Sequence, residues 1–264
     1  MNRPGHRVFL MYHEIEIAGR PLCQDEPGYV RYVVTASDFS AQMQALKDSG
    51  RHGRSVSEAL SGPADCGVVI TFDDGCETDL LTAAPLLRQF GFNGTFYVTV
   101  GFLGRRGYLS RGQLKELADL GFEVGSHSLT HPYLTDLSDE QLFYELSGSK
   151  HELEQITGRP IQHVSCPGGR WDQRVVAKAR QAGYRSVSTS RAAAVTARTT
   201  PFALGRVAVM RGTSLGKFQA LSKGQGLWVI RLKDSLRASV RNLLGNTLYD
   251  RARRRILAKE QENR

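Results

Sequence analysis

Cysteine is scarce in this sequence, and its spacing excludes two kinds of site. The four cysteines, Cys23, Cys66, Cys76 and Cys166, are scattered and form no C-x-x-C pair. Zinc knuckles and thioredoxin-type redox sites both need such a pair. We therefore expect four reduced thiols.

Long apolar segments are also missing. The apolar residues 8–12 are followed at once by His13 and Glu14, which leaves a run too short for the core of a signal peptide. No stretch approaches the roughly 20 apolar residues of a membrane-spanning helix. We expect a cytoplasmic protein, with peripheral attachment to a membrane as a second expectation.

The overall composition excludes several protein classes. Hydrophobic residues make up 41% of the 264 residues and charged residues 23%, which excludes a disordered chain and a collagen-like repeat. No internal repeat or low-complexity segment is present. A chain of this length fits one large domain, and single α/β barrels are common at this size.

Acidic residues are few at the end of the chain. Residues 231–264 contain ten Lys or Arg and four Asp or Glu, a net charge of +6, which leaves +3 of the total +9 for the preceding residues. Apolar residues recur among them at steps of three to five, which predicts a basic amphipathic helix over residues 226–264, broken near Gly245. This extension is expected either to pack on the domain or to bind an anionic membrane surface. Nucleic acid is not expected, because aromatic residues suited to base stacking are lacking.

Strand and helix patterns alternate along the rest of the chain. Strands are predicted at residues 8–12, 67–72, 95–100, 122–126, 163–165 and 184–189, and helices at residues 82–90, 111–120, 138–157 and 174–181. Ser138 and Gln141 form a capping box at the start of one helix. The alternation predicts parallel strands, so residues 1–225 are expected to form a barrel-like α/β domain with its site at the strand carboxyl ends.

Two adjacent carboxylates stand just beyond one predicted strand. Asp73 and Asp74 follow residues 67–72 directly. Since successive side chains of an extended segment point to opposite sides, one carboxylate can face a metal and the other a reacting water. An acidic pair before glycine is also typical of an ordinary turn.

Two histidines follow the next strand but one. His127 and His131 have the i, i+4 spacing that places two imidazoles on one face of a helical turn, as for a shared cation. Two histidines and one carboxylate leave a coordination position for water, which is typical of a catalytic metal site. Capping or surface histidines would show the same spacing.

Three segments together resemble a known family. Residues 71–75 (TFDDG), 127–131 (HSLTH) and 167–169 (PGG) resemble motifs one, two and three of the polysaccharide deacetylases, the NodB-type domain of carbohydrate esterase family 4. Residues 10–14 (LMYHE) resemble the branch that includes poly-N-acetylglucosamine deacetylases. The resemblance extends from about Val8 to Val209 and implies a distorted (β/α) barrel.

The resemblance also implies a role for each matching residue. Asp73 corresponds to the general base, and Asp74, His127 and His131 to the ligands of a divalent metal, typically zinc. The backbone N–H of Gly168, next to Pro167, corresponds to the donor that stabilises the oxyanion. The implied reaction is hydrolysis of an N-acetyl group from an amino sugar in a polysaccharide or a lipid-linked glycan.

The chain departs from the family pattern at two places. The family protonates the leaving amine with a late histidine, yet no histidine follows His163. The branch with an early Tyr-His resembles a circular permutation, in which His13 is the acid; an ordinary imidazole, with a pKa of about 6.5, suits this task.

The second departure lies in motif three. Ser165 stands where the family has arginine, and Gly168 where it has tyrosine, so the groove is expected to lose the bulk of a ring. Arg170 is a candidate to reach back toward Asp73 instead. These changes keep a second hypothesis open, in which the chain is a non-catalytic carbohydrate-binding or scaffold module on a deacetylase fold.

Overall fold

The structure is a computed structural model that describes residues 6–62 and 67–244, with side chains up to residue 235. Its strands are β1 (His6–Tyr12), β2 (Ile15–Glu16), β3 (Val34–Thr35), β4 (Gly53–Arg54), β5 (Val68–Phe72), β6 (Thr95–Val98), β7 (Glu123–Ser126), β8 (His163–Ser165), β9 (Ser186–Thr189), β10 (Val195–Thr196), β11 (Leu204–Gly205) and β12 (Val207–Ala208). Its α-helices are α1 (Pro27–Val30), α2 (Ala36–Asp48), α3 (Val56–Ser61), α4 (Ala84–Phe90), α5 (Arg111–Asp119), α6 (Asp139–Thr157), α7 (Gln173–Gln181), α8 (Leu215–Ser222) and α9 (Leu227–Leu244). Short helical turns are η1 (Asp79–Ala83, π-helical), η2 (Val100–Phe102), η3 (Leu134–Asp136), η4 (Pro167–Gly169) and η5 (Pro201–Ala203).

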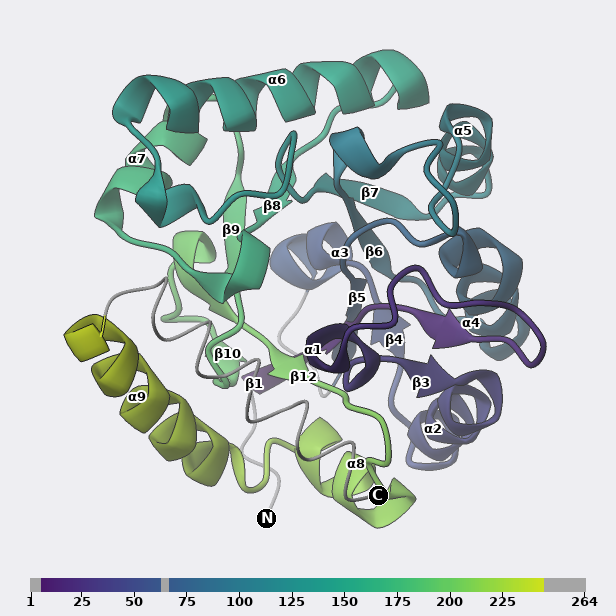
Figure 1. The fold of residues 1–264 in the computed structure, drawn as a ribbon. Coiled ribbons are helices and arrows are strands. Elements are labelled where there is room, and N and C mark those ends of the chain that lie inside the picture. Colours follow the sequence, from purple (N-terminus) through teal and green to yellow (C-terminus); the bar gives the residue numbers. More distant parts are fainter. Residues whose placement is uncertain (1–5, 63–66, 245–264) are drawn as a thin grey trace.

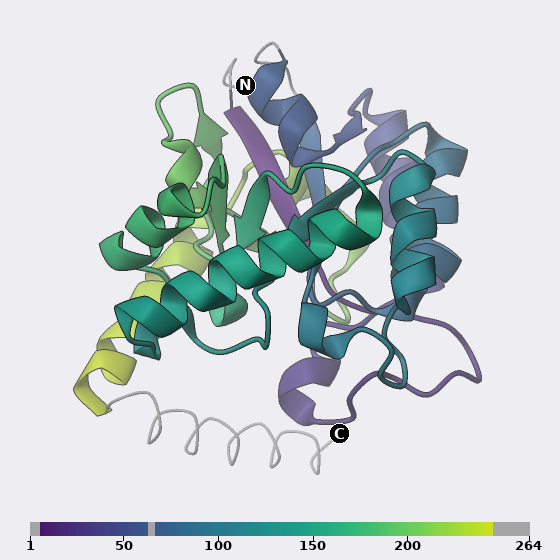
Figure 2. The same ribbon diagram turned by 90° about the horizontal axis from the view of Figure 1, so that it is seen from above.

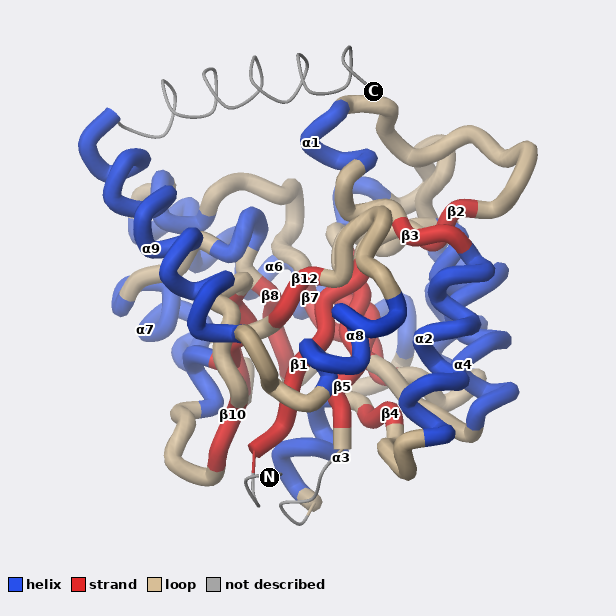
Figure 3. The backbone as a smooth tube through the Cα atoms, turned by 90° about the horizontal axis from the view of Figure 1, so that it is seen from below, coloured by secondary structure: helices blue, strands red, loops and turns tan. Residues whose placement is uncertain are grey.

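The main sheet is a nearly closed barrel of parallel strands. Its order is β1-β5-β6-β7-β8-β9-β11, with β10 pairing antiparallel to the outer side of β1. Helices surround the strands, as Figure 1 shows for α2, α4, α5, α6 and α7. Figure 2 shows the long helix α6 crossing the outside of the sheet, and Figure 3 shows the strands gathered between helices.

The barrel is closed by one short segment. Leu204 pairs with Ser188 of β9, and Val207 pairs with Leu10 of β1, so residues 204–208 pass from one side of the opening to the other. Arg206 is the single residue between β11 and β12. Closure of the barrel therefore places the Arg206 side chain against its contact partners.

The central strand β5 is buried on both faces. All five residues of β5 are buried, as expected for a central strand of a parallel sheet. Aromatic rings fill the space beneath the helices: Phe72 stacks on Phe96 with ring centroids 4.7 Å apart and on Tyr12 at 5.4 Å. This packing fixes the end of β5, from which the two carboxylates follow.

The strands and helices predicted for the body are confirmed, with shifted ends. The helix predicted at residues 82–90 begins as the π-turn η1, and the strand predicted at residues 95–100 ends at Val98 because η2 follows. The capping box of Ser138 and Gln141 is present at α6. The sequence analysis places no element in residues 15–62 or 190–222, where the structure has α1 to α3, β2 to β4, β10 to β12 and α8.

Helix α9 begins the predicted basic extension. Leu227 is buried and Ile230 packs on the core, but Trp228 is 72% exposed and Leu232 is 56% exposed. The predicted break near Gly245 lies outside the described residues, and the domain boundary between residues 225 and 226 stays a prediction. Over residues 6–62 and 67–244, no helix combines the length and apolar character needed to cross a membrane.

Candidate active site

The candidate residues gather at the carboxyl ends of the parallel strands. His13 follows β1, Asp73 and Asp74 follow β5, and His127 follows β7. In barrels of alternating strands and helices, this end of the sheet carries the reactive side chains. The fold therefore brings together residues that lie more than a hundred positions apart in the sequence.

Asp74, His127 and His131 form a compact set of ligand atoms. Asp74 Oδ1 lies 3.5 Å from His127 Nε2 and 3.4 Å from His131 Nε2. One ligand atom from each residue lies within 4.8 Å of the others. His127 Nδ1 lies 2.9 Å from the Ser165 carbonyl oxygen, so its N–H donates there and the Nε2 lone pair faces Asp74.

The charge states of Asp74 and His127 fit a cation, whereas Asp74 outweighs burial and raises the pKa of His131 above its ordinary value. Burial raises the pKa of Asp74, but the nearby imidazoles, His131 foremost and then His13, outweigh it, and the pKa falls below its ordinary value. Burial lowers the pKa of His127 to about 4, which keeps its imidazole neutral near pH 7. Asp74 Oδ1 is buried and has no partner in hydrogen-bond geometry. An ionised carboxylate and a neutral imidazole are the forms that bind a metal.

The backbone is strained at this set. Among the described residues, the only non-glycine residues with positive φ are Asp74 (81°), Ser128 (68°) and His131 (69°). Such conformations cost free energy and cluster at functional sites. The expected helical turn at residues 127–131 is wrong, because these residues form a bend in which Ser128 Oγ accepts a hydrogen bond from the His131 amide.

Asp73 is held by an arginine that the sequence analysis missed. Arg206 donates from Nη1 to Asp73 Oδ1 and from Nη2 to Asp73 Oδ2, both at 2.7 Å. Both side chains are buried, with 0% and 3% of their surface exposed. Burial raises the pKa of Asp73, but the charge of Arg206 outweighs burial and the pKa falls below its ordinary value. Asp73 is therefore ionised near pH 7.

Arg206 makes the contact with Asp73 that was expected of Arg170. The Arg170 guanidinium lies over the ring of Tyr133, 3.4 Å from its centroid, and Arg206 takes the place beside Asp73. Tyr133 also covers Gly168, which has a φ of +61° in the turn that begins at the buried Pro167; a Cβ on Gly168 would lie 2.7 Å from the ring. The Tyr133 ring, from the loop after His131, thus occupies the space that a side chain at position 168 would take.

His13 lies close to both carboxylates. Its charge contributes to lowering the pKa of Asp73 and of Asp74. The ring packs beside Tyr32, with centroids 4.8 Å apart, and its Nδ1 is buried without a hydrogen-bond partner. The role of His13 as the acid stays a prediction, and its position near Asp73 and Asp74 is compatible with that role.

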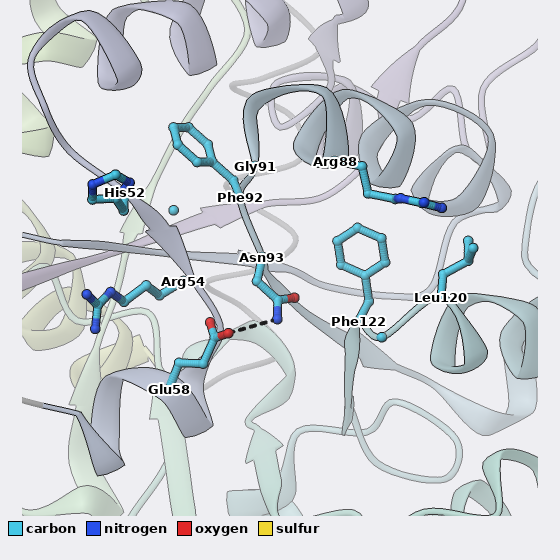
Figure 4. A pocket seen from close by; sticks show the side chains of 11 residues that line it. His52, Arg54, Glu58, Arg88, Gly91, Phe92, Asn93, Leu120 and Phe122 are labelled. Atoms are coloured by element: carbon cyan, nitrogen blue, oxygen red, sulfur yellow. Dashed lines mark hydrogen bonds between the residues drawn. The ribbon is translucent and has the colours of Figure 1, made fainter.

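A separate pocket lies at the opposite end of the sheet. Its volume is about 450 Å³, and its lining includes Phe92 and Asn93 before β6 and Phe122 before β7. Figure 4 shows the pocket, with a hydrogen bond of 3.1 Å from Asn93 to Glu58. None of the candidate catalytic or metal-binding residues lines it.

Comparison with known proteins confirms the resemblance. Residues 62–187 match the family model described as polysaccharide deacetylase. YxkH of Bacillus subtilis, provisionally named a polysaccharide deacetylase, is 29% identical over 224 residues, which are 83% of this chain and 76% of YxkH. A peptidoglycan-N-acetylglucosamine deacetylase of Bacillus cereus is 35% identical over 122 residues, 46% of this chain and 54% of that protein. The Streptococcus pyogenes deacetylase PplD in complex with acetate superposes with a TM-score of 0.72 at 26% identity, over 81% of this chain and 97% of PplD.

Replacing Arg206 tests the buried ion pair. Arg206→Leu should lower the free energy of unfolding by about 3–5 kcal/mol, because Asp73 is left as an unpaired buried carboxylate. Urea denaturation measures this change. The control Arg111→Leu removes an exposed pair with Glu152 and should change it by no more than about 1 kcal/mol. Equal effects of the two substitutions would contradict the assignment.

Proposed function

We propose that the chain removes an N-acetyl group from an amino sugar of a polysaccharide or lipid-linked glycan by metal-dependent hydrolysis, because residues 62–187 match the family model described as polysaccharide deacetylase. One observation carries the proposal. Asp73 and Asp74 are adjacent, yet Asp73 is held by two hydrogen bonds from Arg206 while Asp74 Oδ1 faces two imidazoles without a hydrogen-bond partner. The two carboxylates thus have the different surroundings that a base and a metal ligand need.

The residues present fit a divalent metal, and zinc best. Asp74, His127 and His131 would hold it, since two imidazoles and one carboxylate are a common donor set of catalytic zinc. When bound, the metal polarises the carbonyl and lowers the pKa of water. The strained backbone of Asp74 and His131 holds these donors in place before any ligand arrives.

Asp73 acts as the general base. It accepts a proton from the water that attacks the acetyl carbonyl carbon, and Arg206 keeps it ionised and fixes its orientation. The bidentate geometry leaves the carboxylate little rotational freedom. Arg206 is therefore a positioning residue, which acts on the reaction through Asp73.

His13 and Gly168 complete the reaction. The His13 imidazolium donates a proton to the nitrogen of the leaving amine, and the Gly168 N–H donates a hydrogen bond to the developing oxyanion. The peptidoglycan-N-acetylglucosamine deacetylase similarity supports an N-acetylated glycan as the substrate class. The non-catalytic alternative requires that this arrangement binds a glycan without turnover.

Metal analysis tests the ligand set. After dialysis and reconstitution with zinc, Asp74→Asn and His127→Ala should each bind one zinc equivalent per chain less than the parent protein, because each substitution removes a ligand. Asp73→Asn should keep that equivalent, as should the control His151→Ala, which changes an exposed histidine on α6. Equal zinc in all four variants and in the parent protein would refute the site.

Kinetics separate the base from the acid. With an N-acetylated glycan, Asp73→Asn and His13→Ala should each lower kcat by about 10²–10⁴-fold. With p-nitrophenyl acetate, whose leaving group needs no proton, His13→Ala should keep its activity while Asp73→Asn loses it. If His13→Ala lost activity equally on both substrates, His13 would not be the acid. A parent protein that binds zinc and glycan but releases no acetate would establish the non-catalytic alternative.

We also propose that α9 attaches the chain to an anionic membrane surface on the cytoplasmic side. Trp228 and Leu232 are exposed beside the exposed Arg231 and Lys233. Apolar and basic side chains together on one helix are typical of interfacial binding. A lipid-linked substrate would then lie at the same surface as the site.

Vesicle sedimentation tests this attachment. The full chain should sediment with vesicles that contain an anionic lipid, less so at high salt, and Trp228→Ser should weaken the binding. Tyr144→Ser, which changes a 66% exposed ring on α6, is the control and should have no effect. A chain that stays in the supernatant at low salt would refute the attachment.

A further inference from the structure

A second group of metal-ligating side chains lies beside the catalytic set and shares no residue with it. Glu14, Cys23 and Cys76 each offer one ligand atom, and these atoms lie within 4.8 Å of one another. Glu14 follows β1, Cys23 belongs to the loop before α1, and Cys76 comes two residues after Asp74. Three separate segments at the carboxyl end of the barrel therefore converge here.

Short contacts already hold the three side chains together. The Glu14 carboxylate accepts hydrogen bonds from the Cys23 amide at 3.0 Å and from the Tyr29 hydroxyl at 2.9 Å. The same hydroxyl lies 3.2 Å from Cys76 Sγ, and Cys23 Sγ donates to the Gly107 carbonyl at 2.9 Å. Outer contacts of this kind orient ligands in protein metal sites.

A buried carboxyl group without a hydrogen-bond partner lies close to the group. Glu14 is 2% exposed and Asp79 0% exposed, and neither carboxylate oxygen of Asp79 has a hydrogen-bond partner. After burial, the Cys23 thiol is the largest cause that raises the pKa of Asp79, so the two groups share one region. Buried carboxylates are normally paired with a cation or bound to a metal, and burial without either is costly.

We propose that Glu14, Cys23 and Cys76 bind a second divalent cation of borderline-soft character, such as zinc. Thiolates select such ions, and a carboxylate completes three ligands. Bonds of about 2.0–2.3 Å place tetrahedral ligand atoms less than about 4 Å apart, so small side-chain rotations suffice. Each thiol releases its proton to water on binding.

The ion has a structural role at this position. It ties the loop before α1 to the segment that carries Asp74, and Cys76 also pairs with Tyr108 of the loop beyond η2. Three loops around the catalytic set would then be fixed to one another by bonds that the substrate does not touch. The ion is expected to raise the thermal stability of this end of the barrel.

Cobalt(II) distinguishes the two sites, because only thiolate ligands give an intense near-ultraviolet charge-transfer band. Reduced protein titrated with cobalt(II) without oxygen should show this band, and Cys23→Ser and Cys76→Ser should each lose it. The band should persist in Cys166→Ser and Cys66→Ser, which change cysteines outside the group, and in Asp74→Asn. Persistence in Asp74→Asn separates this site from the catalytic one.

A second variant guards against misfolding. Glu14→Gln keeps both thiols and should weaken cobalt binding, while the circular dichroism spectrum stays that of the parent protein. Zinc should raise the melting temperature of Asp74→Asn but not of the double variant Asp74→Asn/Cys23→Ser. Absence of the band in folded, reduced protein, its persistence in both Cys23→Ser and Cys76→Ser, or a Cys23–Cys76 disulfide that forms despite added zinc would overturn the proposal.

Discussion

The buried pair of Arg206 and Asp73 is the interaction on which the site and the barrel both depend. A guanidinium has five N–H donors, and five hydrogen bonds occupy them: two to Asp73, and one each to Thr71, Ser165 and Thr189. Removing two charges from water is expensive unless every donor and acceptor is satisfied. Here the partners come from β5, β8 and β9, so the pair is stable only when these strands are in register. The same interaction that orients Asp73 therefore also specifies how the barrel closes.

The neighbouring residue, Asp74, has an oxygen that is buried without such a partner. Its Oδ1 is buried without a hydrogen-bond partner, and its backbone is left-handed. Neither feature stabilises the folded chain by itself, and under the proposed function a cation held with His127 and His131 would make both favourable. Two adjacent residues of one sequence motif thus differ in their surroundings: Arg206 holds the Asp73 carboxylate at both oxygens, whereas Asp74 Oδ1 has no hydrogen-bond partner.

Much of this could be predicted from the sequence, for identifiable reasons. Buried strands and the helix capped by Ser138 have local patterns, and Asp73, Asp74, His127 and His131 lie in short motifs that follow strands. Arg206 could not be found by such motifs, because it lies 133 positions from Asp73 and outside motif three. One signal was available: an arginine stands within the apolar run 203–209 (ALGRVAV), and an arginine buried in such a segment needs a buried partner. The left-handed bend at Ser128 and His131 was missed because their residue types do not require positive φ.

The position of Arg206 late in the sequence also affects the order in which the residues of the site come together. The first six barrel strands, β1 to β9, are synthesised before residues 204–208, and they already contain every candidate ligand of the catalytic metal. Arg206 is the largest cause that keeps the pKa of the buried Asp73 low, so without Arg206 burial would favour the protonated carboxyl group. A nascent or partly unfolded chain can therefore hold metal ligands without a competent base. Under the proposed function, hydrolytic capacity would therefore arise only when residues 204–208 close the barrel.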